Sequence, residues 1–335
     1  MEFLYLLESI RNPVFDFFFS LITTLGEETF FLVIALTFFW CIDKREGYYI
    51  LTTGLVGTVI NQGLKLMFRI PRPWILDPNF NAIESAKPAA TGYSFPSGHT
   101  QNIAGTFGSI GLWTKKNSVR IVSLSIIVLV AFSRMYLGVH TPLDVCVSLG
   151  IAAILVIVFH HFFASEERFN KTMPYIIAVC CVISLALLIF VFSLPTDSFD
   201  KEGLVNLESG MKNSATLFGC MLGLILVYTL DRLVIKIETG ARWYMQVIKL
   251  AIGLLIVLAI KSGLKAPLEA FVGLFTDTPE YIARAIRYFI IVAVAGSVYP
   301  LSFKFFEKAR IPFMEKFTEW LTSKFNTECH QSENK

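Results

Sequence analysis

Long apolar segments follow one another along nearly the whole chain, and they limit its possible folds more than any other feature. The first of them, residues 3–25, is interrupted by charged residues and a proline. Each later segment approaches the roughly 20 residues that a helix needs to cross a bilayer. The sequence therefore predicts an all-α, polytopic membrane helical bundle of about ten spans, the later ones near residues 28–42, 47–68, 98–114, 119–138, 142–163, 173–194, 214–231, 245–262 and 282–301.

The composition supports a membrane protein and excludes several other classes. Charged residues make up 16% of the 335 residues, against about 25% in a soluble domain. The net charge of +3 comes without a basic block, so no nucleic-acid partner is expected. The cysteines form no CxxC pair and the five histidines are not spaced with them as ligands, so no metal site and no cofactor is predicted. The opening segment keeps acidic residues and shows no cleavage site, so no removable signal peptide is expected.

Basic residues gather in alternate connections between the predicted spans. Because cytoplasmic loops are enriched in lysine and arginine, we expect these connections and the C-terminus on the cytoplasmic side of the cell membrane. Ten spans place the N-terminus there as well, whereas an interfacial segment at residues 3–25 would leave it outside. The basic residues concerned are Lys44, Arg45, Lys115, Lys116, Arg120, Arg168, Lys171, Arg232, Lys236, Arg242, Lys304, Lys308, Arg310, Lys316 and Lys324.

A polar stretch at residues 164–172 divides the chain into two parts. Residues 1–165 contain three polar clusters and are predicted to form a catalytic membrane domain of six helices. Residues 166–335 add about four apolar spans without a cluster of their own. Their role stays open between a dimer interface in a homo-oligomer, a wall that guides lipid, and a transport module.

The middle cluster is the stretch Pro96-Ser97-Gly98-His99, which lies at the start of an apolar segment. Free backbone N–H groups and the positive dipole end make a helix start favourable for an anion. Gly98 lets the chain approach a ligand closely, and His99 is able to move a proton near neutral pH. The alternative is a turn with a helix cap and an interfacial histidine.

The first cluster consists of Lys65 at the end of a span and Arg72 in the proline-punctuated connection after it. Basic side chains at a helix end often reach toward lipid headgroups, and this is the alternative interpretation. The predicted side is extracytoplasmic, however, where the charge bias does not favour lysine and arginine. Their presence there indicates a bound anion, for which arginine offers a planar fork and lysine a compact charge.

The third cluster contains Arg134, His140 and Asp144. An unpaired charge such as Arg134 within a span costs roughly 2.5–3.5 kcal/mol on insertion scales, so an anionic partner is expected. His140 and Asp144 are four residues apart and share one helical face. A carboxylate that accepts a hydrogen bond from one ring nitrogen leaves the other as a nucleophile or base. The alternative is a pair that only caps and orients a helix.

Together the clusters provide three cations, helix-terminal N–H groups, a serine hydroxyl, two histidines and one orienting carboxylate. Cations that neutralise phosphoryl oxygens, with one histidine attacking and the other donating a proton, suit phosphoryl transfer without a metal. Residue spacing alone does not say which histidine attacks, but the carboxylate favours His140.

The same residues resemble the signature of the type 2 phosphatidic acid phosphatase (PAP2) superfamily, which includes membrane lipid phosphatases and shares its pattern with soluble acid phosphatases and vanadium haloperoxidases. The similarity covers about residues 1–165, the six-helix core, and leaves the C-terminal spans outside it. The matching motifs are Lys65-x6-Arg72-Pro73, Pro96-Ser97-Gly98-His99 and Ser133-Arg134-x5-His140-x3-Asp144.

The resemblance implies a role for each of these residues. His140 would form a phosphohistidine intermediate, Asp144 would orient it, and His99 would serve as general acid and then as base for water. The phosphoryl group would be bound by Lys65, Arg72, Ser97, Gly98 and Arg134.

A site at a membrane face suits a lipid phosphate whose tail stays in the bilayer, beneath a covering connection from Trp74 to Phe95. The candidate substrates are a polyprenyl diphosphate, phosphatidic acid or phosphatidylglycerol phosphate, and a sphingoid-base phosphate. Two other functions remain open: a phosphotransferase with an acceptor other than water, and a non-catalytic membrane transporter or scaffold.

Overall fold

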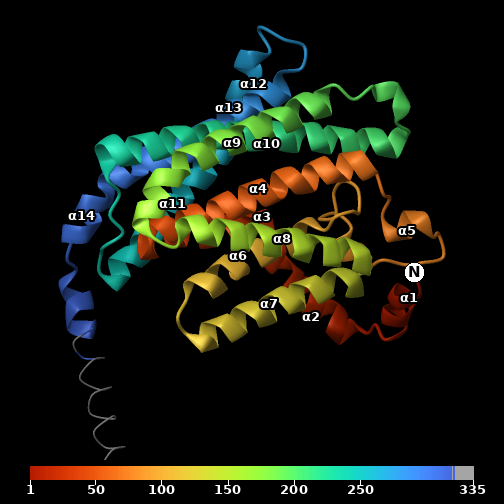
Figure 1. Ribbon diagram of the computed structural model, residues 1–335, viewed down its shortest axis with the longest axis horizontal. Helices are drawn as coiled ribbons and strands as arrows, with labels where there is room; N and C mark the ends of the chain where they lie inside the picture. The colour runs from red at the N-terminus through yellow and green to blue at the C-terminus, as the bar shows by residue number, and fades with distance from the viewer. Residues whose placement is uncertain (319, 321–335) are drawn as a thin grey trace, which may run out of the picture.

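The computed structural model describes residues 1–318 and 320, and these residues form helices and connections without a strand (Figure 1). Lys324 and Cys329 lie outside the described residues. The α-helices are α1 Glu2–Ser9, α2 Pro13–Thr23, α3 Glu28–Thr37, α4 Lys44–Phe68, α5 Pro73–Leu76, α6 Gly98–Trp113, α7 Asn117–Tyr136, α8 Pro142–Phe163, α9 Glu166–Phe192, α10 Lys201–Leu230, α11 Trp243–Gly263, α12 Lys265–Val272, α13 Pro279–Ala293 and α14 Phe303–Lys308.

Short 3₁₀ and π turns connect or extend these helices. The 3₁₀ turns are η1 Thr24–Gly26, η3 Glu84–Ala86, η4 Thr196–Ser198 and η7 Tyr299–Ser302, and the π turns are η2 Phe38–Ile42, η5 Asp231–Ile235 and η6 Val294–Val298.

Six of the described helices are long and apolar enough to cross a membrane, and a seventh span results if the bent pair formed by residues 13–26 and 28–42 counts as one. The polytopic all-α bundle predicted from the sequence is therefore confirmed. The six are Asn117–Tyr136, Pro142–Phe163, Glu166–Phe192, Lys201–Ile235, Trp243–Val272 and Pro279–Lys308.

The N-terminal region differs from the two separate spans expected at residues 3–25 and 28–42. Asn12 caps α2 by accepting hydrogen bonds from the N–H groups of Val14 and Phe15, so α1 and α2 are separate short helices. Helix α2 then meets α3 at an angle of 52°. Two short apolar helices joined at such a bend are together long enough for one broken span, which corresponds to the alternative in which residues 3–25 do not cross alone.

Helix α4 lies in the middle of the bundle, in contact with α6 and α8 on one side and α9 and α10 on the other (Figure 1). Helices α4 and α6 are not among the six apolar spans. Helix α6 has 16 residues, and α4 begins with charged residues and carries buried polar side chains such as Asn61 and Lys65. Both helices carry polar side chains because they line the cavity that contains the predicted site residues.

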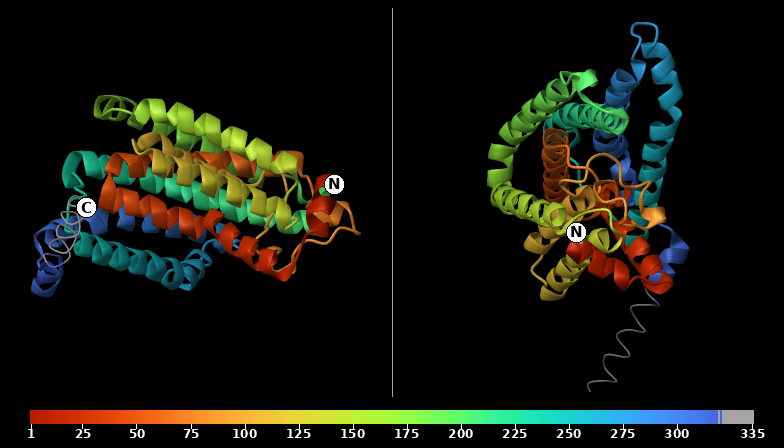
Figure 2. Two further views of the ribbon diagram at one scale, coloured as in Figure 1. Left: turned by 90° about the horizontal axis from the view of Figure 1, so that it is seen from below. Right: turned by 90° about the vertical axis from the view of Figure 1, so that its right-hand side faces the viewer.

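The helix starts that surround the site are defined by capping residues. Ser97 caps α6, and its Oγ accepts a hydrogen bond from the N–H of Thr100. Thr141 caps α8 in a capping box with Asp144, with Pro142 in the first turn. Such caps satisfy N–H groups that a helix leaves free at its start. In space, the capped starts of α6 and α8 meet the end of α4 at one end of the bundle, near α1 and opposite α14 (Figures 1 and 2).

The C-terminal helices pack against the N-terminal helices. Helices α10 and α13 form the most extensive helix pair, and α10 also contacts α4. A Cβ at Gly219 would lie 2.2 Å from the backbone oxygen of Ala285, so this glycine permits the close contact between α10 and α13. Small residues let membrane helices approach in this way.

Candidate active site

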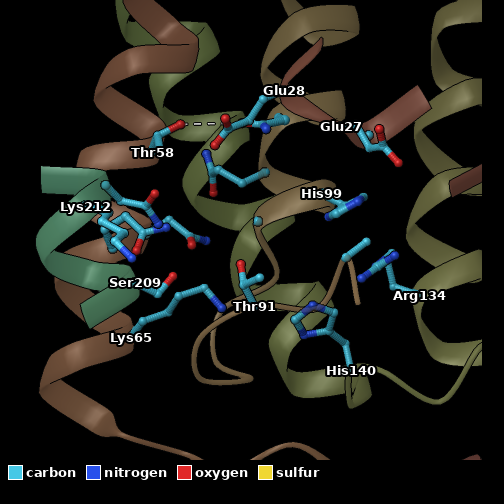
Figure 3. A pocket seen from close by; sticks show the side chains of 18 of the residues that line it. Glu27, Glu28, Thr58, Lys65, Thr91, His99, Arg134, His140, Ser209 and Lys212 are labelled. Atoms are coloured by element: carbon cyan, nitrogen blue, oxygen red, sulfur yellow. Dashed lines mark hydrogen bonds between the residues drawn. The ribbon is translucent and has the colours of Figure 1, made fainter. Parts of the chain in front are cut away.

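A cavity of about 560 Å³ opens at the end of the bundle where α4 ends and α6 begins (Figure 3). Its walls come from α3, α4, α6 and α7, from the connection between α5 and α6, and from α10 and α13. Six of the eight predicted site residues line it: Lys65, Arg72, Gly98, His99, Arg134 and His140.

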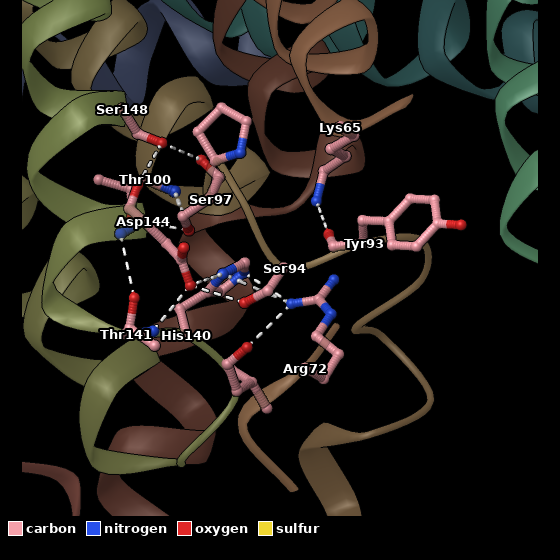
Figure 4. A network of polar contacts seen from close by, with 12 residues as sticks. Lys65, Arg72, Tyr93, Ser94, Ser97, Thr100, His140, Thr141, Asp144 and Ser148 are labelled. Atoms are coloured by element: carbon pink, nitrogen blue, oxygen red, sulfur yellow. Dashed lines mark hydrogen bonds and ion pairs between the residues drawn. The ribbon is translucent and has the colours of Figure 1, made fainter. Parts of the chain in front are cut away.

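His140 lies between a carboxylate and a guanidinium group (Figure 4). Its Nδ1 is 3.4 Å from Oδ2 of Asp144, and its Nε2 is 2.9 Å from Nη1 of Arg72. If Nδ1 carries the proton and donates it to Asp144, the lone pair of Nε2 faces the arginine. The ring is thus held from both sides, with its free nitrogen directed toward a cation.

Asp144 is fixed by groups other than His140. Its Oδ2 accepts hydrogen bonds from Oγ of Ser94 at 2.6 Å and from the N–H of Thr141 at 2.8 Å. Asp144 and His140 are each 1% exposed. A buried carboxylate that accepts several hydrogen bonds keeps its orientation, so Asp144 is able to orient the imidazole.

The connection between α5 and α6 holds two of the cations through its carbonyl groups. Arg72 donates from Nε to Gly92 at 3.0 Å and from Nη2 to Thr91 at 2.8 Å, and Nη1 reaches Val139 at 2.9 Å. Lys65 donates from Nζ to the carbonyl oxygen of Tyr93. The covering segment predicted from Trp74 to Phe95 thus positions phosphate-binding candidates as well as closing the cavity, to which its Thr91 contributes.

Arg134 and His99 present nitrogen atoms without partners. Arg134 is fully buried and donates from Nη1 to Oγ1 of Thr23 at 2.6 Å, while its Nε and Nη2 have no hydrogen-bond partner. Nε2 of His99 is also buried without a partner. Each such group costs about 1–3 kcal/mol, which an anion in the cavity would recover. Figure 3 shows His99, Arg134 and His140 on the same side of the cavity.

Ser97 and Asp144 lie behind the lining of the cavity. Ser97 is fully buried, and its Oγ accepts hydrogen bonds from the N–H of Thr100 at 3.4 Å and its hydroxyl at 3.0 Å. Its backbone oxygen accepts from Oγ of Ser148, and its N–H donates to the carbonyl oxygen of Asp144 at 3.2 Å. These bonds tie the start of α6 to that of α8, so the two histidine-bearing segments are fixed relative to one another.

Burial lowers the pKa of Arg72 and of His140, the two site residues that lie in connections between helices. It lowers the pKa of Arg72 to about 10, with Asp144 opposing the shift, so the guanidinium stays charged at neutral pH. Burial, together with Arg72, Arg134 and Lys65, holds the pKa of His140 well below its usual range. The imidazole is therefore neutral at physiological pH, which is the form that carries a lone pair.

Several residues of the site were not among those predicted. Ser94 and Ser148 stabilise Asp144 and Ser97, and Asn61 lies four residues before Lys65 on α4. Asn61 and Ser148 had a signal in the sequence, since each is a polar residue at helical spacing from a motif residue. Arg284 on α13 had a signal as well, as a charge near the start of an apolar span. The contributions of α10 had none, because they come from a span distant in sequence: Val205, Glu208, Ser209, Lys212 and Asn213.

Within residues 1–318 and 320, no group of three or more His, Cys, Asp and Glu side chains is arranged to hold a metal ion.

Curated proteins similar to this chain include phosphatases acting on two kinds of lipid. A probable sphingosine-1-phosphate phosphatase of Dictyostelium discoideum is 29% identical over 59% of this chain and 52% of its own length. Sphingosine-1-phosphate phosphatase 1 of Mus musculus is 26% identical over 77% of this chain and 62% of its own. Undecaprenyl-diphosphatase BcrC of Bacillus subtilis is 30% identical over 36% of this chain and 59% of its own.

The chain thus spans between about half and three fifths of the length of these relatives. No solved structure matches it.

Two family descriptions match the chain in succession. Residues 46–168 match the PAP2 superfamily, and residues 215–310 match the transmembrane extension of PAP2 superfamily phosphatases. The first match contains every residue of the three motifs, and the second covers the second half of α10 and all of α11 to α14. The chain therefore belongs to the PAP2 superfamily and carries the superfamily's transmembrane extension.

Proposed function

We propose that this membrane protein is a phosphatase that hydrolyses a lipid phosphomonoester or diphosphate through a phosphohistidine on His140, without a metal ion. One observation carries the proposal. Asp144 lies on the Nδ1 side of His140, while Nε2 faces Arg72 in a cavity that also contains Lys65 and Arg134. An oriented, neutral imidazole directed into a cluster of cations is suited to attack an anionic phosphorus centre.

The reaction would proceed in two displacements at phosphorus. The lone pair of His140 Nε2 attacks, a P–N bond forms, the bond to the lipid oxygen breaks, and protonated His99 donates its proton to that oxygen. Water then attacks the phosphohistidine, His99 takes the water proton, and the P–N bond breaks to release phosphate. Lys65, Arg72 and Arg134 would balance the charge on the phosphoryl oxygens throughout.

The remaining two motif residues would act through the backbone. Gly98 lines the cavity beside the phosphoryl site, and a side chain there would approach Oδ1 of Asn61 at 3.8 Å. Ser97 caps α6, and its hydroxyl would have to rotate away from Thr100 to reach the phosphoryl group. We propose that Ser97 chiefly aims the N–H groups at the start of α6 toward that group.

A substrate panel in detergent tests the activity. Wild-type protein should release phosphate in the presence of EDTA from at least one of a polyprenyl diphosphate, phosphatidic acid, phosphatidylglycerol phosphate and a sphingoid-base phosphate. His140→Ala should lose this activity, because no other group in the cavity replaces the oriented imidazole. His161→Ala is the matched control, since His161 is exposed on α8 and outside the cavity.

Two results would refute the proposal. One is turnover retained by His140→Ala, and the other is an absolute requirement of the wild type for a divalent metal. A phosphoenzyme label that is acid-labile, stable to base and absent from His140→Ala would support the intermediate directly.

We also propose that the cavity opens on the extracytoplasmic side of the plasma membrane. The basic residues Lys44, Lys116 and Lys171 lie in the connections or helix starts at the other end of α4, α6 and α8. Under the positive-inside bias that end is cytoplasmic, as is α14 beside it. In this arrangement residues 1–165 supply the reacting groups, and helices α10 and α13 complete the wall of the cavity.

A further inference from the structure

One part of the cavity wall carries hydrogen-bond acceptors that lack donors. Asn61 on α4 and Gln101 on α6 line the cavity and are 2% and 3% exposed. Oδ1 of Asn61 and Oε1 of Gln101 have no hydrogen-bond partner. The orientation of the Asn61 amide is defined because its Nδ2 donates to the carbonyl oxygen of Pro96 at 3.3 Å. Buried acceptors without partners are rare in folded proteins, so these two indicate a ligand that donates hydrogen bonds.

Two carboxylates line the same cavity. Glu27 and Glu28 stand at the start of α3, and Figure 3 shows their side chains beside the cavity above His99. Glu27 is in the capping position but makes no side-chain capping bond. Among the described residues neither carboxylate makes a hydrogen bond or ion pair, whereas Glu208 in the same cavity is paired with Lys212. Both carboxylates are thus free to bind a cationic ligand group.

The chain holds this acidic pair close to the reacting groups. A Cβ at the preceding residue, Gly26, would lie 2.8 Å from Cβ of His99, so the bend between α2 and α3 packs directly on that histidine. Glu27 is also near enough to Arg134 to interact with it electrostatically. Glu28, the next residue, lines the same cavity and is exposed.

The acceptors lie deeper in the bundle than the phosphoryl site. Asn61 precedes Lys65 by one turn of α4, and Gln101 follows Gly98 by about one turn of α6. One turn corresponds to about 5.4 Å along the helix axis. Because α4 ends and α6 begins at the site end of the bundle, both steps lead toward the bilayer centre. A ligand group that meets these acceptors therefore lies between the phosphate and the lipid tail.

We propose that Glu28, Glu27, Asn61 and Gln101 form a subsite for a primary ammonium group that the substrate carries on the tail side of its phosphate. The substrate class is then a long-chain amino-alcohol phosphate, with the amine a few bonds from the phosphoryl oxygen. This inference rests on the proposed phosphatase activity and selects among its candidate substrates. An ammonium group supplies three N–H donors and a positive charge, which two carboxylates and two amide oxygens accept.

The same residues disfavour the other candidates. The second phosphate of a polyprenyl diphosphate would add negative charge near two unpaired carboxylates, and like charges repel. Phosphatidic acid places ester carbonyl groups on the tail side of its phosphate, and these are acceptors that cannot satisfy further acceptors. The amine-bearing ester is the candidate that satisfies both the charge and the unpaired oxygens.

The first test uses wild-type protein and two substrates that differ at the amine alone. We expect kcat/KM for a sphingoid-base phosphate to exceed that for its N-acetyl derivative at least tenfold, because acetylation removes the charge and two of the donors. Equal values, or a preference for the acetylated ester, would overturn the inference. Phosphate release from the acetylated ester would still support the proposed phosphatase, so the two proposals fail separately.

The second test assigns the preference to the subsite. Glu28→Gln keeps the size of the side chain and should lower kcat/KM at least tenfold for the amine-bearing ester while leaving the acetylated ester within about threefold. Glu202→Gln, an exposed carboxylate in the first turn of α10 and outside the cavity, should change neither. Loss on both esters alike, or on neither, would refute an ammonium subsite at Glu28.

Discussion

Arg72 donates a hydrogen bond to the imidazole nitrogen that we propose as the nucleophile. An arriving phosphoryl group would therefore exchange this contact for its own, taking both the lone pair of His140 and the guanidinium. The carbonyl oxygens of Thr91, Gly92 and Val139 keep the guanidinium in place meanwhile. A cation held by the protein needs little rearrangement during the reaction, which is the condition under which electrostatic stabilisation is most effective.

The carboxylate of Asp144 lies beside the proposed nucleophile His140, and its charge can be tested by substitution. Asp144→Asn keeps the shape of the side chain but removes the charge that stabilises a cationic imidazole ring. We expect kcat to fall about 100-fold or more, corresponding to about 2.7 kcal/mol, with KM changed much less. Initial rates of phosphate release measure both constants.

Ser94→Ala is the matched control, since it removes one hydrogen-bond donor from Asp144 and keeps the charge. We expect it to cost less than tenfold in kcat. A rate for Asp144→Asn within threefold of the wild type would contradict the orienting role.

Residues of the site were predictable where they lie three or four positions from another site residue. His140 and Asp144 were expected on one helical face. Nδ1 of His140 does lie 3.4 Å from Oδ2 of Asp144, but His140 precedes the start of α8, so the contact is made from the connection and not along a helix. Ser94 was not predictable, because its contact with Asp144 spans fifty residues and depends on the path of an irregular connection. Ser97 was expected at the phosphoryl group, whereas its hydroxyl is engaged within the cap of α6.

Long apolar segments located most of the membrane-spanning helices, but they did not show which of these helices carry the polar site residues. Helices α4 and α6 bring the site residues together and for that reason are less apolar than their neighbours. The sequence predicted a break between two spans where the structure has a bend between α2 and α3. A short polar run is compatible both with a chain that leaves the membrane and with a chain that only turns within it. The angle of 52° comes from packing that local sequence does not encode.

The contact between α10 and α13 gives a second prediction. Gly219→Ala places a methyl group against the backbone of Ala285, which cannot move aside as a flexible side chain would. We expect the helices to separate, with a loss of about 1–3 kcal/mol in stability and a lower melting temperature in detergent. Activity should also fall, because Lys212 and Arg284 on these helices line the cavity.

Gly150→Ala on α8 is the matched control, since a Cβ there meets nothing within 4 Å. In a helix interior this change should be neutral or stabilising by about 0.5–1 kcal/mol. Equal melting temperatures for the two variants would contradict the close packing at Gly219.

The whole molecule has two distinct ends, one with the cavity, α1 and α5, and the other with α14 (Figure 2). The proposed orientation makes a prediction for a variant without native cysteines. A cysteine at exposed Asn79, near α5, should react with a membrane-impermeant maleimide added to intact cells. A cysteine at exposed Lys171, near the other end, should react after the membrane is permeabilised. Labelling in the opposite order would reverse the assignment.

The wall that α10 and α13 contribute to the cavity has a consequence for biosynthesis. Chains enter the membrane from the N-terminus onward, so all motif residues through Asp144 are inserted long before Arg284 is translated. Until then the cavity lacks the part of its wall that Arg284 on α13 forms. A ribosome-bound chain at that stage holds the reacting groups in an open cleft. Enclosure of the site is thus one of the last steps in making the protein, and truncated chains would be left with an unsealed reaction centre.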